Sequence, residues 1–294
     1  MLGILFYSLL ACDADIGIAQ EKVQNDTYSE QQEIPDDSEF QEEDAFVDFL
    51  QRGSYEVEIE TKAATVTGCE ISYSIYRPAG VSNPPVVVLG HGFARGPDTM
   101  TGWADHLATW GITVLLPSLC HYNVFAGVDH ELNGKNMMEL ADYYGSEETI
   151  YAGHSAGGLA AIIAASIDTN SLGVLGLDAT DTENVPGVPD FIGQNYASGI
   201  DCVGFSIMGE PSSCNSDGNG LTLFEMMNES YVIKVDDADH CDFESPTDAI
   251  CEISCENTET NMSDEEIRSI IFTLGTSAIM SLSGLSSEGW ILWR

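Results

Sequence analysis

The sequence predicts an α/β domain whose mostly parallel sheet carries helices on both faces. Continuous apolar runs at residues 86–89, 112–116, 174–177 and 203–208 are typical of strands that are buried on both faces. Helical stretches separate these runs over about 200 residues, which is the alternation that parallel sheets produce. A further apolar run at residues 149–154 leads through small residues directly into a helix. The 294-residue chain is long enough for one such domain with appended segments.

Two antiparallel strands are expected at one edge of the sheet, where the folded domain (residues 55–294) begins. Residues 55–77 alternate between apolar and polar side chains, which is the pattern of a strand with one buried face. The side chains expected together on one face are those of Val57, Ile59, Ile71, Tyr73 and Ile75.

Helices are expected between the strands and at the end of the chain. The predicted elements include a helix over residues 99–110, a helix over residues 133–144 and a strand over residues 231–235. Ser263 followed by Glu266 is a capping box that opens a final helix through about Met280. Residues 178–202, between two predicted strands, are too few for a separate lid domain, so we expect an open site.

Residues 1–12 are expected to be a signal peptide with a lipobox. The apolar residues 2–11 are too few to span a bilayer, and Leu9-Leu10-Ala11-Cys12 resembles the bacterial motif whose cysteine is lipidated. No Lys or Arg precedes this run, so an ordinary signal peptide or a buried hydrophobic end are alternatives. We therefore expect export, either as a cell-envelope lipoprotein anchored at Cys12 or as a secreted protein.

Residues 13–54 are expected to be a disordered acidic tether. Thirteen acidic side chains and one lysine lie within residues 13–50, too little apolar surface to offset the entropy of an ordered chain. Within this stretch, residues 45–50 are expected to form one short helix that docks on the domain.

The acidic excess of the whole chain excludes several classes of partner. The chain has nine Lys and Arg residues and 48 Asp and Glu residues, which gives a net charge of −39. Such a surface repels phosphate backbones and anionic membranes, so no nucleic acid is expected as a partner. We interpret the charge as a solvated surface, with salt adaptation as one reason for it, and expect a monomer.

Eight cysteines in an exported chain predict disulfides. Seven remain beyond Cys12, so at least one stays free or pairs elsewhere, and bridges are expected among the late cysteines. A zinc site at Cys241, Cys251 and Cys255 is the alternative, but the chain has no C-x2-C pair. The acidic clusters near residues 217–220 and 236–239 do not match a calcium loop. No metal is expected.

The motif Gly153-His154-Ser155-Ala156-Gly157 fits a nucleophile elbow. A serine at a strand-to-helix corner adopts a strained backbone with positive φ, and the flanking glycines let strand and helix pass close together. The new helix directs free N–H groups at negative charge beside the serine. The alternative is a glycine-rich turn with an incidental serine. The presence of the other residues that such chemistry requires distinguishes the two interpretations.

An oxyanion turn is expected directly after the strand at residues 86–89. Gly90, His91 and Gly92 allow a tight turn that directs the Phe93 N–H at the site. The second donor would be the Ala156 N–H, next to the nucleophile. A plain strand-to-helix turn is the alternative.

The general base is expected at His240 and its orienting acid at Asp178. A serine nucleophile needs both, and on an α/β sheet they follow it in the order acid, histidine. His240 lies just past the last predicted strand. Asp178 ends the strand after the elbow helix, while Glu210, one strand later, and Asp181 are alternative acids.

These segments together resemble the α/β-hydrolase superfamily. Gly-His-Ser-Ala-Gly-Gly, His-Gly-Phe, Leu-Asp-Ala-Thr-Asp and Asp-His-Cys-Asp-Phe are most similar to the branch of chlorophyllases, plasma-type platelet-activating-factor acetylhydrolases and cutinase-like polyester hydrolases. In the first two families a Leu-Asp segment soon after the elbow supplies the acid, which favours Asp178. Cutinase-like enzymes take it one strand later, where this chain has only Glu210. The resemblance covers residues 84–243 and implies an esterase without metal or cofactor.

The function expected from this resemblance is a serine carboxylic-ester hydrolase. It would act through an acyl-enzyme on small, lipid-like or polyester substrates. The alternatives are a surface binding module without catalysis and a peptidase or acyltransferase with the same triad. Phe93, Trp103 and Tyr122 are candidates for an apolar acyl groove, although core packing explains an aromatic side chain equally well.

Overall fold

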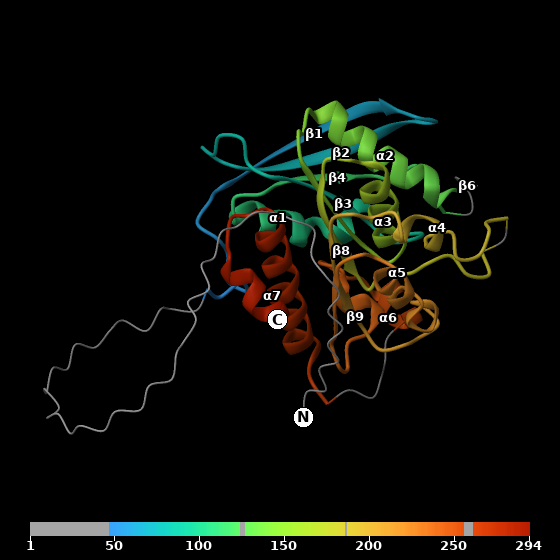
Figure 1. Ribbon diagram of the computed structural model, residues 1–294. Helices are drawn as coiled ribbons and strands as arrows, with labels where there is room; N and C mark the ends of the chain where they lie inside the picture. The colour runs from blue at the N-terminus through green and yellow to red at the C-terminus, as the bar shows by residue number, and fades with distance from the viewer. Residues whose placement is uncertain (1–46, 124–126, 186, 256–260) are drawn as a thin grey trace, which may run out of the picture.

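The computed structural model describes residues 47–123, 127–185, 187–255 and 261–294, and an eight-stranded sheet forms its centre (Figure 1). The strand order is β1-β2-β4-β3-β7-β8-β9-β10. β2 runs antiparallel to both of its neighbours, and every other pair is parallel. The strands are β1 (Val57–Val66), β2 (Cys69–Pro78), β3 (Val86–Gly90), β4 (Thr113–Pro117), β7 (Thr149–His154), β8 (Ser171–Leu177), β9 (Val203–Met208) and β10 (Ser230–Lys234).

Helices cover both faces of the sheet, as predicted (Figure 1). The first face carries α1 (Thr101–Thr109) and α7 (Asp264–Leu282). The second face carries α2 (His130–Tyr144), α3 (Ala156–Ile167), α4 (Gln194–Ala197) and α5 (Leu221–Glu225). The remaining short elements are the hairpin of β5 (Tyr122–Asn123) and β6 (Gly127–Val128), α6 (Ala249–Cys255), η1 (Pro97–Met100), η2 (Ser216–Gly218), η3 (His240–Phe243) and η4 (Glu288–Trp293).

The central strands are mostly apolar because both of their faces are buried. In β3, Val87 and Leu89 pack toward α1 and α7, whereas Val86 and Val88 pack toward α2 and α3. Successive side chains of a strand point to opposite faces, so a continuous apolar run supplies both layers of core. This confirms the interpretation of the apolar runs as central parallel strands.

The edge hairpin of β1 and β2 differs from the sequence prediction in its faces. Ile71 lies opposite Ala64, while Ile59 lies opposite Tyr76. Residues paired across a ladder share a face, so Val57 and Ile59 lie on the other face from Ile71, Tyr73 and Ile75, and the prediction of one common face is wrong. Ile59 is 59% exposed. The turn at Gly68, with φ of 84°, sets this register, which alternation within each strand alone does not reveal.

The packed domain extends N-terminal of Tyr55. Phe49 is fully buried, its ring lies 5.4 Å from that of Trp110, and its carbonyl accepts a hydrogen bond from His106 Nε2. Residues 47–50 dock as predicted but form a turn rather than a helix. Residues 1–46, which include Cys12 and most of the acidic segment, lie outside the described residues.

Other predicted elements agree with the structure to within a few residues. Ser263 and Glu266 form the predicted capping box, in which each side chain accepts from the other residue's backbone N–H. Between β8 and β9, the described part of the chain contains one helix, α4, and no separate lid domain. Among the described residues, no helix combines the length and apolar character that a membrane span requires.

Among the described residues, three disulfides join segments that are distant in the sequence or in different elements. The pairs are Cys69–Cys120, Cys214–Cys255 and Cys241–Cys251, and Cys202 is free. Two of the bridges lie in the late cluster, as predicted, and an odd cysteine remains. Disulfides are typical of proteins that fold outside a reducing cytosol, so export stays the prediction for this chain.

Replacing both cysteines of the Cys69–Cys120 bridge with serine is expected to lower the free energy of unfolding. The bridge joins cysteines that are 51 residues apart. Removing a disulfide that closes a loop of this size lowers the free energy of unfolding by roughly 2–4 kcal/mol, because the unfolded chain gains entropy. Denaturant unfolding of the oxidised proteins measures the loss. Cys202→Ser, which breaks no bridge, serves as the control. Equal stability of the double variant and this control would contradict the expectation.

Candidate active site

Ser155 occupies a strained corner between β7 and α3. Its φ of 56° and ψ of −125° lie in a region that non-glycine residues rarely adopt. The Ser155 N–H donates to the Leu177 carbonyl at the end of β8, and its carbonyl accepts from Thr180 N. The serine backbone is therefore held by the segment that carries Asp178.

Glycines allow three backbones to meet at this corner. A Cβ on Gly157 would lie 2.5 Å from the backbone carbonyl of Gly90, and one on Gly153 would lie 2.3 Å from the carbonyl of Gly157. Real side chains do not tolerate such contacts, so β3, β7 and α3 approach this closely only with glycine at these positions. The predicted reason for the flanking glycines thus agrees with the structure.

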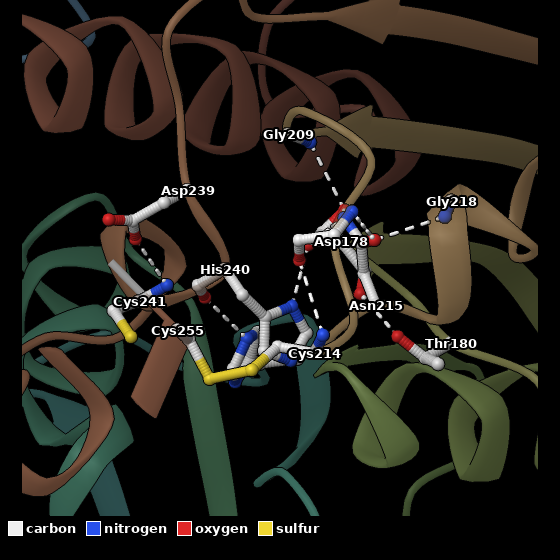
Figure 2. Close-up of polar contacts among 12 residues, drawn as sticks. Asp178, Thr180, Gly209, Cys214, Asn215, Gly218, Asp239, His240, Cys241 and Cys255 are labelled. Atoms are coloured by element: carbon white, nitrogen blue, oxygen red, sulfur yellow. Dashed lines mark hydrogen bonds and ion pairs between the residues drawn. A yellow bond between two sulfur atoms is a disulfide. The ribbon is translucent and has the colours of Figure 1, made fainter. Parts of the chain in front are cut away.

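His240 and Asp178 form a short, buried hydrogen bond (Figure 2). The His240 Nδ1 to Asp178 Oδ2 distance is 2.6 Å, so Nδ1 carries the proton and Nε2 is left as the basic nitrogen. Asp178 follows β8 and has a φ of 44°, and His240 begins η3. Asp239 caps η3, because its carboxylate accepts from the backbone N–H groups of Cys241 and Asp242.

Two further donors hold the Asp178 carboxylate. Gly209 N donates to Oδ1 at 3.1 Å, and Asn215 Nδ2 lies 3.1 Å from Oδ2 and 3.3 Å from Oδ1. Figure 2 shows the His240 ring and the Asn215 amide converging on this carboxylate from separate loops. These donors replace the hydrogen bonds to water that the carboxylate loses on burial.

The two alternative acids lie in other environments. Glu210 pairs with Lys234 at 2.6 Å on the surface. The Asp181 carboxylate accepts from the backbone N–H groups of Thr182 and Gly193, and burial raises its pKa. Neither carboxylate contacts His240, so the geometry pairs the histidine with Asp178.

His154 connects the elbow to the histidine loop. Its Nε2 donates to the His240 carbonyl at 2.9 Å, and the two rings lie 4.5 Å apart. Burial lowers the pKa of His154 well below its usual value, so this ring is neutral. Within the described ranges, no hydrogen bond joins Ser155 Oγ to His240. Catalytic hydrogen bonds often tighten only when substrate is bound.

The turn after β3 presents a free backbone donor beside the elbow. In the part of the chain that the structure describes, the N–H groups of Phe93 and Ala156 donate to no acceptor. Both residues line one narrow crevice, which is too small for a water molecule in this structure, together with Gly92. Two free N–H groups at one crevice are the donor set that an oxyanion hole requires.

His91 supports this turn in a neutral form. Its Nε2 accepts from Leu119 N at 3.1 Å, so its Nδ1 carries the proton and lies 3.0 Å from the Gly92 carbonyl. Burial lowers the pKa of His91 to about 4. The ring packs edge-on against Tyr122.

An ion pair whose carboxylate is buried joins the same turn to the histidine loop. Arg95 Nε and Nη2 donate to the two carboxylate oxygens of Glu244 at 2.7 and 2.6 Å. Glu244 is buried and lies four residues after His240, whereas Arg95 is partly exposed and also lies 3.1 Å from Asp248. Bidentate pairing fixes direction as well as distance.

The three candidate groove aromatics separate in the structure. Phe93 and Tyr122 line the crevice beside the elbow. Trp103 is instead buried in the core, where its ring stacks on Phe272 at 4.0 Å and its Nε1 donates to the Phe243 carbonyl. Core packing therefore explains Trp103, and the groove prediction is wrong for this residue.

The late cysteines offer no thiolate for a metal in this structure. The sulfur atoms of Cys241, Cys251 and Cys255 lie within 4.8 Å of one another, but each belongs to a disulfide. A disulfide sulfur lacks the negative charge that zinc ligation requires.

Comparison with known proteins supports the fold. No model of a known protein family matches the chain, and no curated protein matches its sequence. A solved structure described as a membrane phospholipase A, a novel bacterial virulence factor, matches with a TM-score of 0.51 and 13% identity. The match covers 60% of this chain and 78% of the other. Together with the strand order, this likeness shows the α/β-hydrolase fold.

Sequence reasoning missed the residues that support the site. Asn215 lies outside the motifs and Glu244 directly follows one of them, and no spacing rule connects them to Asp178 or Arg95. The one local signal is Asn215-Ser216-Asp217-Gly218, a turn sequence that indicates a tight loop but not its neighbour.

His91→Gln is expected to make the free energy of unfolding less dependent on pH in the acid range. His91 has a pKa of about 4 when folded and about 6.5 when unfolded, so the unfolded state binds more protons between these values. Its contribution is present above pH 6.5 and is lost as the pH falls toward 4. The stability advantage of the wild type over His91→Gln should therefore shrink by up to about 2 kcal/mol between pH 7 and pH 5. Urea titrations at the two pH values measure it, and a constant difference would contradict this assignment.

Proposed function

We propose that this protein is a serine carboxylic-ester hydrolase with Ser155 as nucleophile, His240 as general base and Asp178 as the orienting acid. One observation carries the proposal: a 2.6 Å bond from His240 to a buried carboxylate, on a loop that His154 ties to the strained Ser155 corner. Strain of this kind is retained where function needs a side chain in a fixed, exposed position.

The base acts through its second ring nitrogen. Asp178 accepts the Nδ1 proton, which leaves His240 Nε2 unprotonated and able to take the proton of Ser155 Oγ as that oxygen attacks the ester carbonyl. The imidazolium then donates this proton to the departing alkoxide. Asp178 stabilises the imidazolium by its charge and does not itself take the proton.

The negative charge of the tetrahedral intermediate falls on the former carbonyl oxygen. The free N–H groups of Phe93 and Ala156 support a role as its hydrogen-bond donors, and α3 begins at Ala156 with its positive dipole end at the same point. Water then repeats the cycle on the acyl-enzyme. No step of this mechanism requires a metal or a cofactor.

The substrate class is an uncharged ester that reaches an open site. No lid domain separates β8 from β9 in the described part of the chain, which favours an open site for lipid-like and polymeric esters. The net charge of −39 disfavours strongly anionic substrates. Small, lipid-like and polyester esters remain the proposed range.

Ser155→Ala is expected to lower kcat for p-nitrophenyl esters by at least about 10³-fold, because the acyl-enzyme can no longer form. A fluorophosphonate probe should label wild type at Ser155 and leave the variant unlabelled, as mass spectrometry of the labelled peptide would reveal. Unchanged hydrolysis in Ser155→Ala would exclude the mechanism. A binding module without catalysis would give neither hydrolysis nor labelling, and cleavage of amides rather than esters would favour a peptidase.

Asp178→Asn is expected to lower kcat by about 10²–10⁴-fold, because an amide in this position cannot stabilise the imidazolium. Glu210→Gln removes an exposed pair with Lys234, an interaction worth at most about 1 kcal/mol, and should leave kcat within about twofold. Steady-state kinetics on the same ester compare the two. The assignment fails if Glu210→Gln alone abolishes turnover.

A further inference from the structure

Asn215 is a buried amide that the triad itself does not include. It is fully buried, on the loop between β9 and α5, and it precedes η2 as its N-cap. Its Nδ2 lies 3.1 Å from Asp178 Oδ2, the oxygen that His240 Nδ1 also binds (Figure 2).

The loop determines which way this amide faces. Asn215 Oδ1 accepts from Ser212 N at 2.8 Å and from Gly218 N at 3.0 Å. Both partners are donors, so the oxygen must face them and the NH₂ group must face Asp178. The orientation of Asn215 is thus set by the loop backbone and is independent of Asp178.

Its two N–H groups are both used. One donates to the Glu210 carbonyl at 2.9 Å, and the other is shared between the two carboxylate oxygens of Asp178, at 3.1 and 3.3 Å. A donor shared in this way restrains rotation of the carboxylate about its own bond. Rotation would move Oδ2 away from the His240 Nδ1–H.

The loop is anchored to the histidine segment. Cys214, next to Asn215, is bridged to Cys255, and Cys241, next to His240, is bridged to Cys251. Both partner cysteines lie on α6. This one short helix is therefore covalently linked to the loop that carries Asn215 and to the segment that carries His240. The positions of the donor and of the base are therefore coupled.

We propose that Asn215 is a positioning residue of the hydrolase, which holds the Asp178 carboxylate in register with His240 through its side-chain N–H. It acts through Asp178 and touches neither substrate nor the reacting atoms. The inference rests on the proposed function, since it assigns Asn215 a part in the reaction of that site.

Asn215→Asp tests this role. The new carboxylate keeps Oδ1 as acceptor for Ser212 N and Gly218 N, but it loses both N–H donors, the one toward Asp178 and the one toward the Glu210 carbonyl. Like charges in a buried site repel, so the pair of carboxylates takes up one proton as the pH falls. A protonated Asp at position 215 donates an O–H to Asp178 in place of the lost N–H.

The expected result is a fall in kcat of about 100-fold or more at pH 8 with KM within about twofold, because the defect lies in the transition state. The ratio of wild-type to variant kcat should narrow as the pH falls toward 6, when the new carboxyl is protonated. The downfield proton resonance of the His240 Nδ1–H should shift or broaden in parallel.

Asn219→Asp is the matched control. It makes the same change four residues away, where Asn219 bonds to the backbone of Asp181 and does not contact Asp178. It should leave kcat within about twofold of the wild-type value. The pH profile of kcat and the His240 resonance should be indistinguishable from those of the wild type. Where Asn215→Asp does not fold, Asn215→Ser keeps a capping hydroxyl that is too short to reach Asp178, and should lower kcat by about tenfold or more at unchanged KM.

Wild-type kcat and an unchanged His240 resonance in folded Asn215→Asp, or in folded Asn215→Ser, would overturn the inference. Equal losses in Asn215→Asp and Asn219→Asp would do the same, since they would reveal a purely structural effect of the added charge. These outcomes leave Ser155-dependent hydrolysis by the wild type intact. Absence of that hydrolysis would instead overturn the proposed function, and this inference with it.

Discussion

The approach of three backbones at Gly90, Gly153 and Gly157 is the constraint on which the rest of this structure depends. A Cβ at Gly157 would lie 2.5 Å from the Gly90 carbonyl. The backbones of β3, β7 and α3 can therefore approach this closely only because these positions are glycine. This contact leaves Ser155 at a positive φ and brings the turn after β3 beside it. The free N–H groups of Phe93 and Ala156 then line the same crevice.

Burial of charge is the second constraint, and hydrogen bonds compensate it. Asp178 has no exposed surface, yet three donors from two loops surround its carboxylate: His240, and Gly209 with Asn215 from the loop between β9 and α5. The Arg95–Glu244 pair does the same for the turn after β3. Such networks are costly when incomplete, and when complete they favour a single arrangement. Two disulfides on α6 hold the loops that supply these donors.

The acidic surface and the buried site have separate roles. Most of the 48 acidic residues are absent from the site, whose charged and polar groups are few. The net charge influences the sign of the ligands that approach, whereas the proposed chemistry depends on a handful of buried contacts. Fold alone does not select a substrate.

The sequence by itself determined the layered α/β class, the order of the motifs along the chain and the elbow at Ser155. Each of these depends on local patterns: apolar runs, glycine spacing and the capping box at Ser263. It also ranked Asp178 first among three acids by its place at a strand end. Only the tertiary structure decided the faces of Val57 and Ile59, the burial of Trp103, and the contacts of Asn215 and Glu244. Those depend on strand register and on loops meeting across 37 and 149 residues, and neither leaves a local signature in the chain.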